Sequence, residues 1–293
     1  MNSVKETIKS HYDSLTKLQK IVAKTIIEDP KVVILQTAKE LGVLTGTSET
    51  TVIRFCYAIG YKGYANLQDE IQKELLVSKD MDTLSRFEKM SDSSSNFEEL
   101  AYKEMNQDLK YIQKTLEEFN NQLYSDIVDA IIKAKRIVVI GFRISYAPAH
   151  WLSYTLNVVK GNTTLYRGEV DDANFILSDI DENYLVIAIS FPRYAQETIS
   201  FVRAAKSKGA KIFALTDDEF SPIGRYSDFL IKVTTPEPTS IKGMPTIFSI
   251  LNLFVTGVMN QDKNNVQKQL SKYRESSNLF HSFVASNSSK ESD

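Results

Sequence analysis

From Arg136 onward, short apolar runs alternate with stretches of helical spacing, and this alternation constrains the fold more than any other feature. Four of the runs are nearly continuous in apolar residues, and a weaker one lies between the first two. The five runs are 137-IVVIGF, 163-TTLY, 185-LVIAISF, 212-IFALT and 229-FLIKV. Apolar strands separated by helices are typical of a parallel sheet that is covered on both faces. The sequence therefore predicts a three-layer α/β domain in this half of the chain.

The first 77 residues have helical spacing throughout and contain no strand-like run. Leu15, Leu18, Val22 and Ile26 form a stripe that predicts one helix, which Pro30 ends. Three further helices are expected, over residues 37–44, 48–59 and about 64–77. The N-terminal part is thus predicted to be an all-α domain.

The stretch between these two parts loses its periodicity and ends in a serine-rich run, as linkers do. Two polar helices, 96–119 and the one that begins near residue 262, are candidate dimer elements. The expected organisation is a helix-turn-helix domain over 1–77, a linker over 78–95, an α/β domain with a leading helix over 96–265, and a C-terminal helix with a disordered tail over 266–293.

Two of the N-terminal helices have the proportions of a helix-turn-helix. The first opens on a capping box, in which the Thr37 hydroxyl accepts from the backbone N–H of Glu40 and the Glu40 side chain reaches back. Ser48 is the expected N-cap of the second, and a short turn around Gly46 joins the two helices.

The second helix divides into a buried and an outward face. Val52, Phe55, Cys56 and Ile59 recur at helical spacing and form the expected buried stripe. The outward side chains are small hydroxyls and one arginine, which suit hydrogen bonds to base edges and phosphates. The candidate DNA-binding residues are Lys17, Thr47, Ser48, Glu49, Thr50, Thr51, Arg54, Tyr61 and Lys62. The alternative is a small helical bundle with a solvated face.

The charge balance excludes binding to nucleic acid by bulk electrostatics. The net charge is −2, and residues 1–77 carry only one more cation than anions. DNA affinity must therefore come from locally placed cations and from dimerisation. A single cysteine and the lack of a long apolar run indicate a protein of the reducing cytoplasm without a disulfide framework, a Cys-based metal site or a membrane span.

Two loops of the α/β half fall where a ligand is expected, outside the carboxyl ends of parallel strands. The first is 141-GFRIS and the second is 190-SFPRY. Two arginines at strand ends suggest an acidic ligand, although either could instead form a structural ion pair or a dimer contact. The candidate effector-binding residues are Gly141, Arg143, Ser145, Ser190, Arg193 and Tyr194.

A catalytic or metal-binding constellation is not apparent in the sequence. The three histidines are far apart, and His150 is expected to be a partly buried structural residue. The pair Asp171–Asp172 is expected to cap a helix, and Asp217–Asp218 to belong to a loop after a strand. We therefore predict no catalytic residue, no metal and no cofactor.

The segments that have been described resemble a known family. The N-terminal stretch, including SETTVIRF and then GYKGY, resembles the DNA-binding domain of RpiR-type (MurR/RpiR) regulators. The second half resembles the sugar isomerase (SIS) domain of the same family, a parallel-sheet fold of the flavodoxin-like, nucleotide-binding type. The resemblance rests on Gly141, Ser145, Ser190 and the stretch around Thr216 and Ser221. It implies a homodimer or homotetramer that binds operator DNA and senses a small metabolite, usually a phosphorylated sugar.

The chain departs from this pattern in both loops. Arg143 stands at the second glycine of the usual G-x-G-x-S loop. In the usual S-x-S-G-x-T loop, Pro192, Arg193 and Ala195 replace the second serine, the glycine and the threonine. These changes remove two hydroxyls and one N–H donor and add two guanidinium groups. An anionic effector, either a sugar phosphate or a carboxylate, is therefore expected.

We thus expect a transcription regulator that is not an enzyme. One alternative is a phosphosugar isomerase built on the same SIS fold, which the altered loops and the N-terminal domain disfavour. Another is a protein-binding module, which would have no affinity for operator DNA.

Overall fold

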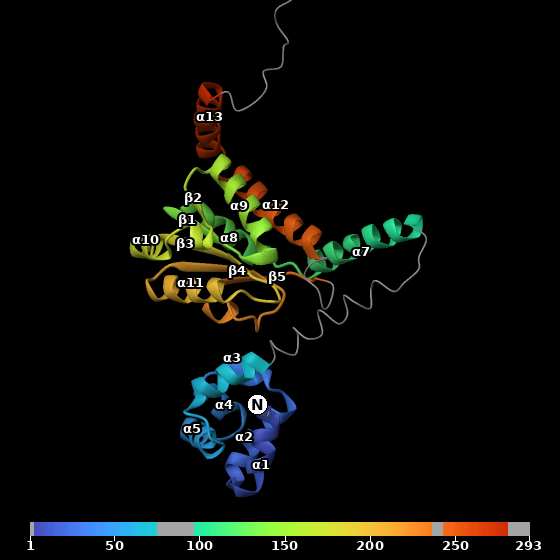
Figure 1. The fold of residues 1–293 in the computed structure, drawn as a ribbon, viewed down its shortest axis with the longest axis vertical. Coiled ribbons are helices and arrows are strands. Elements are labelled where there is room, and N and C mark those ends of the chain that lie inside the picture. The colour runs from blue at the N-terminus through green and yellow to red at the C-terminus, as the bar shows by residue number, and fades with distance from the viewer. Residues whose placement is uncertain (1–2, 75–96, 236–242, 281–293) are drawn as a thin grey trace, which may run out of the picture.

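The computed structural model describes residues 3–74, 97–235 and 243–280, which form a helical unit and an α/β unit (Figure 1). The predicted linker over 78–95 and the last ten residues, which are predicted to be disordered, lie outside the described residues.

The N-terminal unit is helical, as predicted. Its elements are α1 (Val4–His11), the 3-10 turn η1 (Tyr12–Ser14), α2 (Lys17–Glu28), α3 (Lys31–Leu35), α4 (Ala38–Leu44), α5 (Glu49–Ala58) and a helix over residues 64–74. Side chains cap three of these helices through capping boxes, at Ser3, Thr16 and the predicted Thr37. Apolar side chains from all the helices meet in one core around Phe55, which is fully buried.

The predicted burial of one residue in the α2 stripe is wrong. Val22 and Ile26 are buried, but Leu18 is exposed and Ala23 is buried in its stead. At 100° per residue, Leu18 lies about 90° from the centre of the arc that Val22, Ala23 and Ile26 define. It therefore lies at the edge of the core rather than within it.

The second unit contains all five predicted strands. They are β1 (Arg136–Ile140), β2 (Thr163–Tyr166), β3 (Tyr184–Ile189), β4 (Lys211–Thr216) and β5 (Phe229–Lys232). The helices are α7 (Phe97–Glu117), α8 (Asn121–Lys133), α9 (Tyr146–Val159), α10 (Ala173–Asp179), α11 (Gln196–Ser207), α12 (Met244–Gln261) and α13 (Lys263–Phe280), with 3-10 turns η2 (Arg143–Ser145), η3 (Gly168–Val170) and η4 (Gly224–Tyr226).

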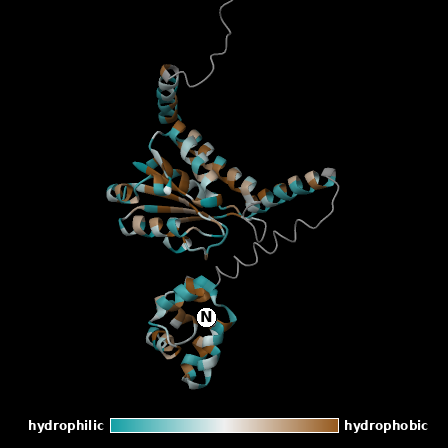
Figure 2. Cartoon of the chain, viewed as in Figure 1, coloured by the Kyte–Doolittle hydropathy of each residue, from teal (hydrophilic) through white to brown (hydrophobic). Residues whose placement is uncertain are grey.

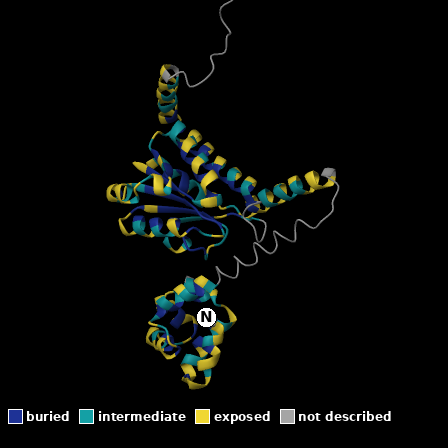
Figure 3. Cartoon of the chain, viewed as in Figure 1, coloured by how far each residue is buried: buried dark blue, intermediate teal, exposed yellow. Residues whose placement is uncertain are grey.

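The strands form one parallel sheet in the order β2-β1-β3-β4-β5. Alternate residues of each strand point to opposite faces, so Ile137 and Val139 join one core while Val138 and Ile140 join another. Helices α8, α9 and α12 cover the first core, and α10 and α11 cover the second. Figures 2 and 3 show the result, with hydrophobic, buried strands between the two helical layers. The predicted three-layer fold is confirmed.

The order of the strands fixes where a ligand can bind. The chain moves from β1 to one neighbour, β2, and then returns to the other side of β1 to form β3. The loops after β1 and β3 therefore lead to helices on opposite faces of the sheet, and ligands of such sheets usually bind at the carboxyl edge between two such loops. Both candidate loops of the sequence begin at this edge.

Candidate DNA-binding and effector sites

A tight turn joins α4 to α5, and backbone groups close it. The backbone N–H of Thr47 donates to the Gly42 carbonyl at 2.7 Å, and the buried Thr45 hydroxyl donates to the Leu41 carbonyl at 2.8 Å. Gly46 takes a left-handed conformation, with φ of 62°, which side chains rarely adopt. The direction in which α5 leaves the turn is thus set by hydrogen bonds and by a glycine.

Gly42, which is not among the residues predicted from the sequence, lets the two helices approach closely. A Cβ atom at this position would lie 3.0 Å from the backbone nitrogen of Glu49 and 3.0 Å from the carbonyl carbon of Ser48. A glycine inside a helix costs about 1 kcal/mol relative to alanine. That cost was the available signal, because a glycine in a short helix points to a backbone contact.

The faces of α5 follow the prediction in most respects. Val52, Phe55 and Cys56 are buried, and Ile59 follows just after the helix. Ser48 caps the helix by accepting from the backbone N–H of Thr51 at 3.2 Å. The exposed side chains at its start and in its first turns are Ser48, Glu49, Thr50 and Arg54.

Two of the predicted contact residues face outward only in part. Thr47 and Thr51 are half-buried, and their hydroxyls bond to the hydroxyls of Thr45 (2.9 Å) and Ser48 (3.0 Å). The exposed Arg54, in contrast, has no hydrogen bond or ion pair within the described part of the chain. Arg54, the one cation of α5, is therefore exposed and available for a contact with DNA.

The other predicted contacts lie outside α5. Lys62 is exposed, and Lys17 is exposed at the first turn of α2. The Tyr61 ring packs against the helical core, where burial raises the pKa of its phenol. Tyr57, which is not among the predicted residues, is exposed three residues after Arg54 and so continues the same face of α5.

The first loop at the sheet edge depends on a close approach at Gly141. A Cβ atom there would lie 2.5 Å from the Ser145 carbonyl oxygen and 3.1 Å from that of Ile189, so any side chain would separate the ends of β1 and β3. Arg143 is exposed and has a φ of 57°, in the left-handed region. Of the described residues other than glycine, it alone has a positive φ.

Two predicted serines lie at the ends of neighbouring strands. Ser145, at the start of α9, and Ser190, directly after β3, are both buried. The backbone N–H of Ser190 donates to the Leu215 carbonyl at 3.1 Å, which extends the pairing of β3 with β4. Two further buried hydroxyls, on Thr198 of α11 and on Ser221 after β4, have no hydrogen-bond partner among the described residues.

The second loop is tied to β4 by an aromatic side chain. The Tyr194 hydroxyl donates to Asp217 Oδ1 at 2.7 Å, and the Thr216 hydroxyl lies 3.3 Å from the same oxygen. Burial and the neighbouring carboxylate raise the pKa of Tyr194 well above its ordinary value. The Tyr194 hydroxyl is thus engaged in holding the loop, while Arg193 is exposed beside it.

The loop after β4 also contacts the helical unit. Lys31 Nζ lies 5.1 Å from the centre of the Phe220 ring, and Arg225 Nη1 lies 3.2 Å from Asp69 Oδ1. A single loop therefore contacts the Tyr194 loop at the carboxyl edge of the sheet, through Asp217, and the unit that carries α5.

The remaining polar residues have structural roles or lie at the surface. Asp172 caps α10, as predicted for the acidic pair, whereas Asp171 pairs with Arg167 at 2.5 Å. Asp218 accepts from the backbone N–H of Phe220 at 3.0 Å, as expected of a loop residue. The prediction for His150 is wrong, because α9 turns it to solvent, where it stacks on Tyr146.

Two negative findings hold for the described residues only. They contain no group of three or more histidine, cysteine or acidic side chains that could hold a metal ion. None of their helices is long and apolar enough to cross a membrane.

Comparison with known proteins assigns both units. Residues 2–78 match the model of the helix-turn-helix domain of the rpiR family, and residues 130–257 match that of the SIS domain. The chain is a helix-turn-helix transcriptional regulator of the RpiR family with a SIS domain. The RpiR-type resemblance seen in the sequence is thereby confirmed.

Similar proteins span nearly the whole chain. The HTH-type transcriptional regulator HexR of Pseudomonas aeruginosa is 25% identical over 94% of this chain and 96% of its own length. An HTH-type regulator of Clostridium perfringens is also 25% identical, over 84% of this chain and 88% of its own. The structure of Vibrio vulnificus NanR, complexed with ManNAc-6P, superposes with a TM-score of 0.59 at 19% identity and covers 94% of this chain and 98% of NanR. These relatives are named regulators, and the structural match shows the shared fold.

Proposed function

We propose that α5 is the recognition helix of this regulator and that Arg54 makes its main polar contact with DNA. The observation that carries this proposal is the exposure of Thr50, Arg54 and Tyr57 along one face of a helix whose opposite face is buried. A helix presented in this way fits the major groove, where arginine bonds to guanine or to phosphate. Ser48, Glu49, Lys62 and Lys17 are candidate flanking contacts, while Thr47, Thr51 and Tyr61 contribute chiefly by shaping the turn and the core.

The test is binding of the full chain to a duplex taken from upstream of its own gene. An arginine contact is worth about 1–3 kcal/mol, so Arg54→Ala should weaken binding by about 5- to 150-fold. Arg274→Ala is the matched control, because it removes the same charge from an exposed position on α13. Equal affinity of the Arg54→Ala and Arg274→Ala proteins would overturn the assignment.

We further propose that a crevice at the carboxyl edge of the sheet binds a small anionic metabolite. Gly141 and Ser145 form its first wall, Ser190 and the Arg193 loop form its second, and Arg143 and Arg193 supply positive charge. The unpartnered hydroxyls of Thr198 and Ser221 are further candidate donors in this region. NanR, which has the same fold, was solved with ManNAc-6P, and this supports a sugar phosphate as the ligand class. A carboxylate is equally suited to two guanidinium groups.

Thermal shift with ManNAc-6P, other sugar phosphates and small carboxylates tests this site, since a ligand of the folded state raises its melting temperature. Arg193→Ala and Arg143→Ala should each reduce the shift given by the compound that acts on the wild type. Lys208→Ala is a control on an exposed cation at the other end of α11. A shift that is unchanged in both arginine variants would place the ligand elsewhere.

Because the helical unit carries almost no net charge, we propose that the protein acts as a homodimer or a higher oligomer in the cytoplasm, on two operator half-sites. The loop after β4, which contacts Tyr194 on one side and the helical unit on the other, is the proposed route of coupling between ligand and DNA.

We propose no catalytic activity. An isomerase needs a positioned acid and base, and the phenol of Tyr194, bonded to Asp217 and raised in pKa, cannot release a proton near neutral pH. The purified chain should therefore not interconvert aldose and ketose phosphates. Turnover that is lost in Tyr194→Phe would restore the enzymatic alternative.

A further inference from the structure

Helix α7 carries a row of apolar side chains that are exposed in the described part of the chain. Tyr102, Met105, Leu109 and Leu116 are 76%, 71%, 62% and 68% exposed. With Ile112, they recur at alternating intervals of three and four residues, which is the spacing of a coiled-coil seam. We call these five residues the α7 stripe. Helix α7 projects from the α/β unit, with only its Glu117 end against the body (Figure 1).

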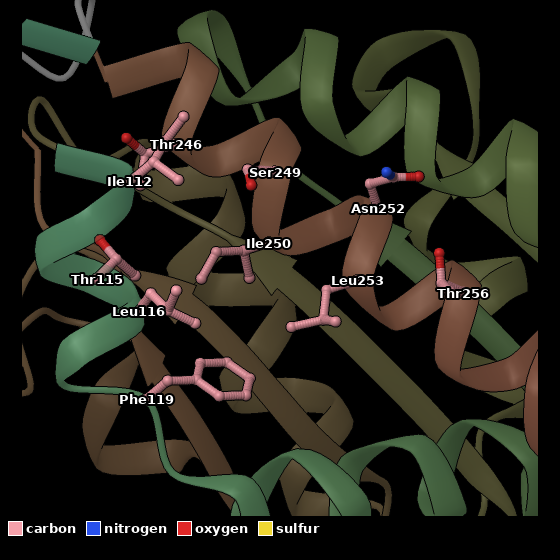
Figure 4. Close-up of a pocket in the computed structure, with 10 residues that line it drawn as sticks. All are labelled: Ile112, Thr115, Leu116, Phe119, Thr246, Ser249, Ile250, Asn252, Leu253 and Thr256. Carbon is pink, nitrogen blue, oxygen red and sulfur yellow. The ribbon is translucent and has the colours of Figure 1, made fainter. Parts of the chain in front are cut away.

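A groove lies at the base of the same helix. It is a cavity of about 300 Å³ between α7 and α12, and its apolar walls are Ile112, Leu116, Phe119, Ile250 and Leu253. Figure 4 shows side chains of both helices pointing into it. Ile112 and Leu116 belong both to the stripe and to the groove, so the groove continues the stripe.

The stripe and the groove are complementary when a second copy is placed antiparallel to the first. A two-fold axis at Leu109 sets Tyr102 opposite Leu116 of the other copy, because both lie seven residues from Leu109. The projecting apolar end of each α7 then enters the groove of the other, and the same contact forms twice. A parallel pair would leave both grooves empty.

The exposed stripe supplies about half of the area that such a contact usually buries. At roughly 150 Å² for a large side chain, the exposed fractions amount to about 400 Å² per copy, half of a standard interface, and the groove walls add to it. The largest apolar patch on a monomer is typically about 300–600 Å² and is often functional. The heptad spacing favours a second helix of the same spacing as the occupant, and α7 itself has that spacing.

We propose that α7 pairs antiparallel with α7 of a second copy, crosses it near Leu109, and inserts Tyr102 and Met105 into the partner's groove. The inference deepens the proposed function, on which it rests only for the role of the dimer. Such a pairing would supply the second copy that binding to two operator half-sites requires.

Cysteine cross-linking of the full chain tests the pairing directly. The natural Cys56 is buried, so a new surface thiol can be introduced without removing it. Under mild oxidation, Leu109→Cys should give a disulfide-linked dimer, while Lys110→Cys on the neighbouring exposed face should not. Leu116→Cys alone should stay unlinked but should link to Tyr102→Cys when the two proteins are mixed. A Leu116→Cys homodimer, or no link through Leu109→Cys, would overturn the proposal.

Light scattering gives a second measurement. Wild type should have at least twice the chain mass of 33.2 kDa, and Leu109→Lys should have half the wild-type mass with an unchanged circular dichroism spectrum. Lys110→Glu is the control and should keep the wild-type mass. If Leu109→Lys keeps it as well, the α7 contact is wrong while the proposed oligomer stands. If wild type has the mass of a single chain, both are wrong.

Discussion

Replacing Arg143 by glycine should stabilise the α/β unit, although it removes a candidate ligand contact. Arg143 has a φ of 57°, a conformation in which the Cβ of an L-residue is crowded by the backbone at a cost of about 1–2 kcal/mol. Glycine removes that cost but gains freedom in the unfolded chain worth about 0.4–1 kcal/mol. The net expectation is a gain of about 0.5–1 kcal/mol in the free energy of unfolding.

Arg143→Ala is the matched variant for this experiment. Alanine also removes the guanidinium but keeps the Cβ, so it should be less stable than glycine by the same 0.5–1 kcal/mol and close to wild type. Any difference between the two variants therefore reports the backbone conformation and not the lost charge.

Urea unfolding followed by tryptophan fluorescence provides the assay. The only tryptophan, Trp151, lies in α9 and packs edge-on against Phe248 of α12, so its signal reports the α/β unit alone. The free energy of unfolding should be higher for Arg143→Gly than for wild type and for Arg143→Ala. Its slope against urea concentration should be the same in all three proteins. If Arg143→Gly is no more stable than Arg143→Ala, the left-handed conformation is not the source of strain that we infer.

Three further substitutions test the helical unit. Gly42→Ala should destabilise it by about 1–3 kcal/mol despite the better helix propensity of alanine, because its Cβ would press on the backbone at Ser48 and Glu49. Hydrogen exchange measures this, and α4 and α5 amides that exchange as slowly as in wild type would contradict it. Ser48→Ala should cost about 1 kcal/mol through loss of the N-cap, measured by thermal melting, and an unchanged melting temperature would argue against the cap. Burial raises the pKa of Cys56 from 9.0 to about 12, so the stability it confers is complete below pH 9 and is lost as the pH rises from 9 towards 12. In that range stability should fall more steeply for wild type than for Cys56→Ser, and parallel pH profiles would contradict a buried neutral thiol.

Local patterns predicted much of this fold. The five strands follow from apolar runs too short for helices, and the caps at Thr37 and Ser48 follow from residue types at fixed offsets. The buried stripe of α5 follows from its spacing. Each of these signals lies within one segment of the chain, so no knowledge of the tertiary structure is needed to read it.

Contacts between distant segments could not be predicted from such local patterns. The need for Gly42 arises only where α4 crosses α5, and Tyr194 meets Asp217 only because β3 and β4 are neighbours. His150 was expected to be partly buried, but which side of α9 faces the sheet depends on how α9 packs. The left-handed conformation of Arg143 could have been inferred, since it stands where the family pattern has a glycine.

A ligand bound at the carboxyl edge of the sheet is proposed to change the affinity of α5 for DNA. Fluorescence anisotropy of the full chain on its upstream duplex, with and without a saturating amount of the panel compound that most raises its melting temperature, tests this most directly. Allosteric coupling of ordinary size, about 1–3 kcal/mol, predicts a change of about 5- to 150-fold in the Kd for DNA, and the change should disappear in Arg193→Ala. A Kd that is the same with and without the bound ligand would contradict the account.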